Sequence, residues 1–394
     1  MPWKELTVEE ERMKFVVAWK SGGWSISDLC REFGISRKTG YKYIQRYKES
    51  GLDGLRDQSR APKIQAFAVN DRIIEVIVNQ RKKHPTWGAK KLLASLTVKF
   101  PSINNWPSET TVLRILHRNK LVPTKRRYKK PVPVYPFSHV LGPNDVWSAD
   151  YKGHFTVGNG QRCDPLTVTD AYSRFLLGCR IVSKLDTLNA QKVFIRLFRE
   201  YGMPLAIRTD NGSPFASNSI AGLSRLSVWW LKLGINLERI EPGKPQQNGR
   251  HERMHRTLKQ ETALPPRSSL EDQQRAFNAF KKEYNNFRPH EALKNKTPSN
   301  YYQKSERIYP EKIIEPAYST NIDVYKVNDL GFINHAEFRV FLSSALVDEL
   351  IGIEEFSERH ARIHFYRSVL GILDLYTGKV LQFKNPKYIN VKDL

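Results

Sequence analysis

Helical periodicity dominates the first part of the chain. Apolar side chains recur on one face of residues 8–20, which predicts an amphipathic helix. Residues 24–36 predict a short helix that Ser25 can cap and a tight turn at Gly34. Ser36 can cap a second helix that follows this turn. Two helices joined by such a turn form a helix-turn-helix, so we expect one within residues 1–62.

The same kind of pattern returns in residues 63–122. An apolar run at 73–77 marks one helix, His84 and Pro85 precede a second, and Ser108 or Thr110 can cap a third. We therefore expect a second helix-turn-helix module, with the two tryptophans of this segment in its core.

Strand patterns take over after residue 138. Apolar runs of strand length precede a helical pattern at 187–201, and this order argues for a mixed α/β core, which we place at 138–303. In residues 317–394, short segments of alternating apolar and polar residues are separated by turns that glycines mark. We therefore expect a small β-barrel there. The sequence thus predicts a multidomain α/β protein. The expected core strands are 145–151, 165–169, 175–182 and 205–209.

Charge narrows the class of partner. The 394 residues include 64 Lys and Arg against 40 Asp and Glu, a formal net charge of +24, and this excess is typical of proteins that bind a polyanion. No apolar stretch approaches the roughly 18 residues that span a membrane, and the N-terminus does not resemble a signal peptide. Nucleic acid is therefore favoured over a membrane. Three cysteines without metal-binding spacing predict core thiols in a reducing cytoplasm and no zinc site.

Residues 123–137 mix basic residues with prolines between the helical modules and the core. Such a segment cannot bury a core of its own, so we expect an extended linker. On DNA its cations would follow the phosphates and make binding steeply dependent on salt. The strongest candidates for these contacts are Lys125, Arg126 and Arg127.

Three acidic residues stand in distinctive settings. Asp150 lies on an expected strand, Asp210 follows another strand, and Glu252 lies at the start of a basic helix. If the fold brings them together, they form a negative cluster that hard divalent cations neutralise. Two such cations about 4 Å apart are a common device for cutting and joining phosphodiesters. We therefore predict catalysis by these acids with two Mg²⁺ ions per site, for which Mn²⁺ can substitute.

The segments around these acids resemble a known catalytic core. Thr-Asp-Asn-Gly-Ser around Asp210 and Gln-Asn-Gly-Arg-His-Glu-Arg around Glu252 are similar to the Asp-Asp-Glu core of retroviral integrases and bacterial insertion-sequence transposases, above all the IS3/IS481-like group. The resemblance implies a ribonuclease-H-like core and an SH3-like C-terminal barrel. The interval between Asp210 and Glu252 is longer than in the compact viral cores, which we interpret as a surface insertion around residues 221–226.

A transposase is the function that this resemblance implies. Such an enzyme binds the terminal repeats of its insertion sequence, hydrolyses a phosphodiester there, and joins the 3′-hydroxyl to target DNA. Its partners would be double-stranded DNA and further copies of this chain, as a dimer or tetramer, because two ends must meet at one target. Two alternatives remain open: a DNA-binding relic or regulator without catalysis, and a ribonuclease-H-like nuclease that cuts without joining.

Candidate DNA contacts form three further groups. Helical spacing puts Glu252, Arg256 and Lys259 on one face, where the cations could hold phosphates, although the pattern also fits an ordinary surface ion pair. Polar contacts are expected from three side chains that lie close to Asp210 or Glu252 in the sequence: Asn211, Gln247 and Asn248. The second helix of the predicted helix-turn-helix in residues 1–62 presents a polar face that could read DNA or simply be solvated: Arg37, Lys38, Lys42, Gln45 and Arg46.

Two other acids compete for a role at the site. Asp170 also follows a strand, and we expect it to bond Ser173 or Arg174 and fix a turn. Glu291 lies near the end of the core, in a segment that we interpret as packing and helix termination and not as a source of metal ligands.

Overall fold

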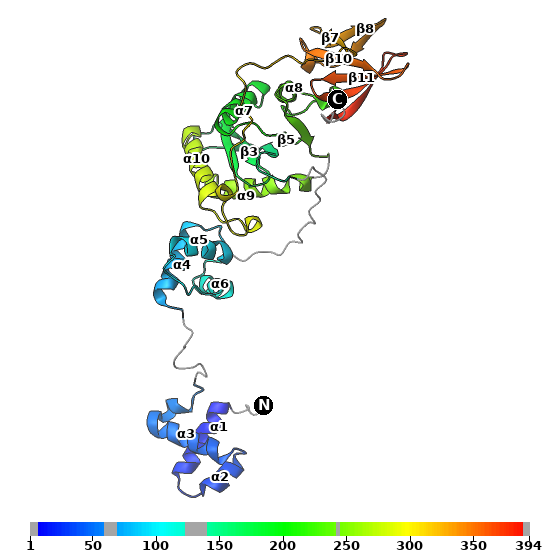
Figure 1. Cartoon of the computed structure of the whole chain (residues 1–394). Helices are drawn as coiled ribbons and strands as arrows, with labels where there is room; N and C mark the ends of the chain where they lie inside the picture. Colours follow the sequence, from blue (N-terminus) through cyan, green and yellow to red (C-terminus); the bar gives the residue numbers. More distant parts are fainter. Residues whose placement is uncertain (1–6, 59–68, 123–139, 242–244, 389–394) are drawn as a thin grey trace. The chain divides into compact units, whose positions relative to one another are not determined.

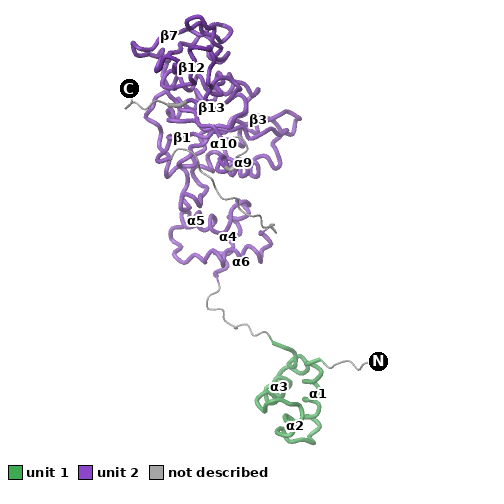
Figure 2. The backbone as a smooth tube through the Cα atoms, turned by 90° about the vertical axis from the view of Figure 1, so that its right-hand side faces the viewer, with its two compact units in different colours: residues 1–68 green, residues 69–394 purple. Residues whose placement is uncertain are grey.

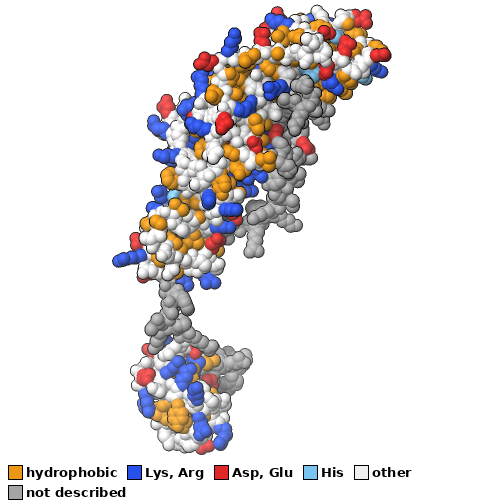
Figure 3. Space-filling model, in the orientation of Figure 1, with side chains coloured by type: hydrophobic (Ala, Val, Ile, Leu, Met, Phe, Trp, Pro, Cys, Tyr) orange, Lys and Arg blue, Asp and Glu red, His pale blue; other side chains and the backbone are white. Residues whose placement is uncertain are grey.

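The computed structural model describes residues 7–58, 69–122, 140–241 and 245–388. The chain divides into two compact units, residues 1–68 and residues 69–394 (Figure 2). Lys and Arg side chains are spread over both units on the face that Figure 3 shows, as the positive net charge predicts. The expected linker contacts Lys125, Arg126 and Arg127 lie outside the described residues.

The first unit is a three-helix module made of α1 (Val8–Lys20), α2 (Ile26–Glu32) and α3 (Arg37–Ser50) (Figure 1). Each helix begins after a hydroxyl side chain that accepts a backbone N–H of the first turn, which satisfies one of the free donors there. These caps are Thr7, Ser25 and Ser36. The predicted turn is present, with Gly34 at φ +62°, so the helix-turn-helix prediction is confirmed.

Close packing holds α3 against the other two helices. A Cβ added at Gly40 of α3 would lie 2.5 Å from the sulfur of Cys30 and 3.0 Å from the ring of Phe15. Ile44 is buried one turn further along α3, with 5% of its surface exposed. Because one side of α3 is buried in this way, its opposite, polar side lies on the surface. That side carries most of the predicted DNA contacts.

A second helical module opens the larger unit. It consists of α4 (Asp71–Lys83), α5 (Ala89–Lys99) and α6 (Glu109–Arg118), and Ser108 caps the third helix as predicted. Trp87 is 1% exposed and packs in the apolar core of this module. The expectation that it is a core residue is confirmed.

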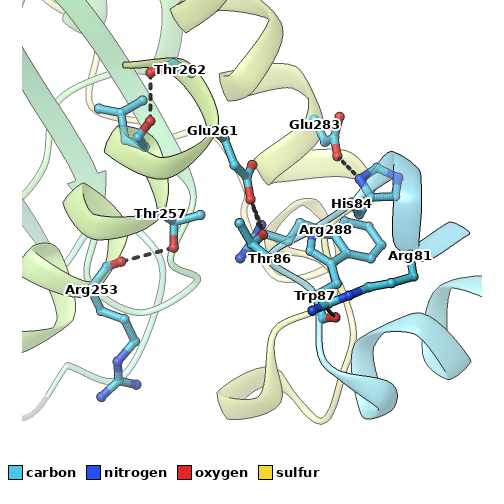
Figure 4. Close-up of polar contacts among 11 residues, drawn as sticks. Arg81, His84, Thr86, Trp87, Arg253, Thr257, Glu261, Thr262, Glu283 and Arg288 are labelled. Carbon is cyan, nitrogen blue, oxygen red and sulfur yellow. Dashed lines mark hydrogen bonds and ion pairs between the residues drawn. The ribbon is translucent and has the colours of Figure 1, made fainter. Parts of the chain in front are cut away.

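Polar contacts join this module to the central domain (Figure 4). Thr86 donates a hydrogen bond of 2.6 Å to Glu261, which also pairs with Arg288. The Arg288 side chain is 6% exposed and that of Glu261 21%. Beside them, His84 Nδ1 lies 2.8 Å from a carboxylate oxygen of Glu283. Glu261 is thus the shared acceptor for the half-buried Thr86 hydroxyl and the buried Arg288 guanidinium.

The charge of Glu261 is expected to contribute measurably to stability. Glu261→Gln removes the carboxylate that pairs directly with the buried Arg288 guanidinium, so we expect a loss of about 2 kcal/mol, seen as a lower urea midpoint. Glu291→Gln is the matched control, because the Lys90–Glu291 pair spans the same junction with 45% and 74% of its side chains exposed. That change should cost less than about 0.5 kcal/mol. Equal effects would contradict this explanation.

The central domain is built on a six-stranded mixed sheet (Figure 1). Its strand order is β2-β3-β1-β5-β6, with β4 also paired to β3. Strands β1, β3 and β4 pair antiparallel, whereas β1, β5 and β6 run parallel. The strands are β1 (Val146–Tyr151), β2 (Phe155–Thr156), β3 (Arg162–Asp170), β4 (Leu176–Val182), β5 (Ala206–Thr209) and β6 (Asn236–Arg239). The predicted α/β core is confirmed, and β2 and β6 are additions to the four strands expected.

Helices cover both faces of this sheet. Successive side chains of β3 point to opposite faces: Leu166 and Val168 join the cluster that includes α7, while Cys163 joins the cluster that includes α9 and α10. The four helices are α7 (Thr187–Tyr201), α8 (Arg225–Lys232), α9 (Gly249–Thr262) and α10 (Leu270–Asn286). By the same alternation, Thr167 and Thr169 face α9.

The C-terminal part is an open sheet and not the expected SH3-like barrel. Five antiparallel strands run in the order β13-β12-β11-β10-β7, so β13 and β7 are its two edges, and β8 and β9 form a separate hairpin. These strands are β7 (Asp323–Lys326), β8 (Phe332–His335), β9 (Phe338–Phe341), β10 (Leu350–Glu355), β11 (His360–Phe365), β12 (Ser368–Asp374) and β13 (Val380–Tyr388). The β13 edge packs on residues 220–222 and β6 of the central domain. Because another domain covers this edge, the sheet does not need to close on itself.

The expected surface insertion is also wrong. Ala221, Leu223 and Leu226 are all fully buried. They belong to one apolar cluster with residues of β10 and β11, including Ile351 and Ile363. Residues 221–226, between the second and third acids, therefore form the buried surface against which the C-terminal sheet packs.

Candidate active site

The sheet itself brings the first two acids together. Parallel pairing aligns Ser148 of β1 with Arg208 of β5. Asp150 and Asp210 each lie two residues further along, at the same end of neighbouring strands, so they occupy equivalent positions. The backbone N–H of Gly212 donates to Asp210 Oδ1 at 3.2 Å, which ties the carboxylate to the turn after the strand.

The third acid comes from α9. Glu252 lies in the first turn of that helix, on its exposed side. Asn248, the residue directly before α9, donates a hydrogen bond of 2.9 Å from its side-chain amide to Asp150 Oδ2. This bond links the start of α9 to β1. Arg256 and Lys259 are exposed on the same helix, as the helical spacing predicts.

The pKa of Asp150 reflects the nearby charges of the other two carboxylates. Burial, the negative charge of Asp210 and that of Glu252 together raise the pKa of Asp150 to about 7, although the hydrogen bond from Asn248 opposes the rise. A carboxylate in such surroundings gains from a nearby cation. The donor set, three carboxylates with partial access to water, fits a hard divalent ion.

A tighter group of possible ligands contains histidines. One ligand atom each from Asp150, His251 and His255 lies within 4.8 Å of the others, whereas Asp150, Asp210 and Glu252 form no such group among the described residues. His255 Nδ1 is 3.9 Å from Asp150 Oδ2. The structure thus places Asp210 and Glu252 near Asp150 but brings the imidazoles closer.

The two histidines belong to a buried network that sequence reasoning missed. Thr167 Oγ1 lies 2.7 Å from His251 Nε2 and 2.6 Å from His255 Nε2. Thr169 Oγ1 lies 3.0 Å from His251 Nδ1. Burial lowers the pKa of His251 to about 3 and that of His255 to about 2. The available signal was the four-residue spacing of the histidines, which puts both on one face of α9.

The predicted polar contacts are engaged within the protein. The Asn211 amide donates to the carbonyl of Ile240 at 2.6 Å, and Gln247 accepts the backbone N–H of Glu241 at 2.9 Å. Gln247 is 5% exposed and Asn248 9%. Their role in DNA binding remains a prediction; in this structure they shape the loops around the acids.

The predicted reading face of α3 is mostly open to solvent. Arg46 is half-buried, because its guanidinium lies 5.7 Å from the ring centre of Tyr43. The other four side chains are exposed: Arg37, Lys38, Lys42 and Gln45. The Gln45 amide donates to Glu49 at 3.0 Å.

The two competing acids have other roles. Asp170 is fully buried and accepts hydrogen bonds from the backbone N–H and hydroxyl of Ser173 at 2.7 and 2.6 Å, and from the N–H of Asn144 at 2.8 Å. The prediction that it bonds Ser173 and fixes the turn is confirmed. Glu291 pairs with Lys90 at 3.5 Å, at the junction with the second helical module.

Comparison with known families agrees with this architecture. Models of the integrase core domain match residues 141–245 and 233–298. A helix-turn-helix domain model matches residues 11–63, and a homeodomain-like domain model matches residues 39–116. The fold and these matches define a protein that combines helix-turn-helix domains with an integrase core.

Individual relatives narrow the family. An uncharacterized protein of insertion element IS407 from Burkholderia multivorans is 28% identical over 49% of this chain and 68% of its own length. The transposase for transposon Tn552 from Staphylococcus aureus is 25% identical over 61% of this chain and 53% of its own length. The chain is therefore similar to proteins of insertion elements and to a transposase, with an integrase-type core, and it spans only about half the length of the second relative.

Among solved structures, the catalytic core domain of HTLV-2 integrase in complex with magnesium matches 42% of this chain and all of its own, at 19% identity and a TM-score of 0.34. A score this low supports no detailed superposition. In the described part of the chain, no helix combines the length and apolar character that crossing a membrane requires.

Proposed function

We propose that this protein is a DNA transposase that binds the terminal repeats of its insertion sequence and carries out metal-dependent 3′-end cleavage and strand transfer. The observation that carries the proposal is the meeting of Asp150 and Asp210 at one end of adjacent parallel strands, with Glu252 close enough to raise the Asp150 pKa. In the proposal, the two helical modules, 1–62 and 63–122, recognise the element ends, and residues 138–303 carry the chemistry.

Asp150, Asp210 and Glu252 would hold Mg²⁺, two ions per site, with Mn²⁺ as a substitute. Such ions activate a water or a DNA 3′-hydroxyl for in-line attack and stabilise the leaving oxygen. The chain contributes the positions of the ligands: Asn248 holds the Asp150 carboxylate in place, and Gly212 does the same for Asp210.

Basic residues beside the acids would hold the DNA. Arg256 and Lys259 are exposed on α9 with Glu252, so phosphates of a DNA end can lie against the helix where its carboxylate stands. The exposed cations of α3 would contact a different stretch of the same DNA. Since two element ends must reach one target, we propose that the active form is a homo-oligomer.

A joining assay tests this function. Purified protein is incubated with labelled DNA from the flanks of its gene, a supercoiled plasmid, and Mg²⁺ or Mn²⁺. Label transferred to the plasmid supports a transposase. Cutting without joining would favour the nuclease, and flank binding without metal-dependent chemistry in either ion would favour a non-catalytic DNA-binding protein.

A further inference from the structure

The hydrogen atoms around Thr167 can be assigned from its neighbours. A threonine hydroxyl has one proton to donate and two lone pairs with which to accept. Thr167 Oγ1 lies 3.0 Å from the carbonyl oxygen of Asp150, which can only accept. The hydroxyl proton therefore goes to that carbonyl, and the two imidazole nitrogens within hydrogen-bond distance must both donate to Oγ1.

This assignment fixes the tautomers of both histidines. Each carries its proton on Nε2, so each Nδ1 is a bare lone pair. For His251 that lone pair is used, because the Thr169 hydroxyl lies 3.0 Å away and can donate to it. For His255 the lone pair faces Asp150 Oδ2 across 3.9 Å. When Asp150 is ionised, two electron-rich atoms thus face one another across this gap.

A cation resolves this arrangement. Bonds of about 2.1 Å from a metal ion to nitrogen and to oxygen together span up to about 4.2 Å, so one ion can reach both atoms across the observed distance. Asp150 Oδ2 keeps its hydrogen bond from Asn248 through its other lone pair. His255 is 9% exposed and Asp150 19% at their side chains, so water reaches the carboxylate side of the gap more easily than the imidazole side.

We propose that His255 Nδ1 is a ligand of the ion that Asp150 holds, so that this site has one nitrogen donor in addition to its carboxylates. The inference rests on the proposed function, because it concerns the same ion. His251 takes no direct part, because both of its nitrogens bond threonines.

The nitrogen donor has a consequence for metal choice. Mg²⁺ strongly prefers oxygen ligands, whereas Mn²⁺ and later transition metals accept imidazole. The site is therefore selective for Mn²⁺ over Mg²⁺ to a degree that three carboxylates alone would not produce. Replacing His255 by Asn removes the donor and should reduce Mn²⁺ affinity about tenfold, with a change of less than about threefold for Mg²⁺.

Pulsed electron paramagnetic resonance of the whole protein with bound Mn²⁺ tests the ligand directly. We expect a nitrogen coupling that changes to the ¹⁵N pattern when the protein contains ¹⁵N-labelled histidine. This readout needs no variant and no DNA, so a folding defect cannot obscure it. Bound Mn²⁺ without a histidine coupling would overturn the proposal.

Two variants identify which histidine is responsible. His255→Asn should remove the coupling, whereas His251→Asn, from the same buried network, should retain it. Persistence of the coupling in His255→Asn would refute the assignment. The joining assay on the same preparations separates the two proposals: joining without nitrogen coupling overturns only the ligand, and coupling without joining overturns only the function.

Discussion

Replacing any one of the three acids by its amide is expected to abolish DNA cutting and joining. Asp150→Asn, Asp210→Asn and Glu252→Gln each remove a negative charge that holds the metal ions, and losing their stabilisation of the transition state, roughly 4 kcal/mol, corresponds to about a thousandfold in rate. Binding of the element ends should remain, because the helix-turn-helix cations lie in other parts of the chain.

The measurement is strand transfer into plasmid, beside end binding in a gel-shift assay. Glu291→Gln is the control, because Glu291 is an exposed acid of the same domain that pairs with Lys90. It should join at the wild-type rate. Substantial joining by any of the three amide variants would remove that residue from the proposed catalytic set.

The same substitution at Asp150 is expected to make the metal-free protein more stable. The pKa of Asp150 is raised to about 7 by burial, the charge of Asp210 and that of Glu252, from an ordinary value of 3.8. A raised acid pKa means that folding favours the protonated form, so its contribution to stability is present below about pH 4 and is lost as the pH rises to about 7. At pH 8 the cost is up to about 3 kcal/mol, after allowance for solvent screening.

Urea unfolding in EDTA at pH 5 and pH 8 measures this effect. We expect Asp150→Asn to raise the unfolding midpoint at pH 8 and to have a smaller effect at pH 5. Adding Mg²⁺ or Mn²⁺ should stabilise the wild type more than the variant, because the ion offsets the carboxylate repulsion. A variant that is no more stable than the wild type at pH 8 would show that Asp150 is not strained in the free protein.

Local patterns in the sequence were enough to predict the helical modules and most of the central sheet. Ser25, Gly34 and Ser108 work within a few residues of their own positions, so their caps and turn can be recognised without knowing the fold. The proximity of Asp150 to Asp210 was inferred from resemblance, and the parallel register of β1 and β5 supplies its physical basis.

What could not be predicted depends on partners far away in the chain. The 221–226 segment was interpreted as surface because its burial comes from strands more than a hundred residues later. The barrel was expected because nothing local indicates that β13 packs on the central domain. The role of Thr167 was missed for the same reason, since an ordinary strand threonine becomes notable only when two histidines 84 and 88 residues away meet it.

The burial of residues 221–226 limits where related proteins can exchange domains by recombination. The N-terminal unit ends near residue 68 and has its own apolar core. A different helix-turn-helix unit could therefore be acquired by exchanging that unit alone. The C-terminal sheet has no such independence, because Ile351 and Ile363 share a core with Ala221 and Leu223. A crossover between the central domain and this sheet would pair surfaces that were never selected together, so hybrids joined there should be insoluble, whereas those joined near residue 68 should fold.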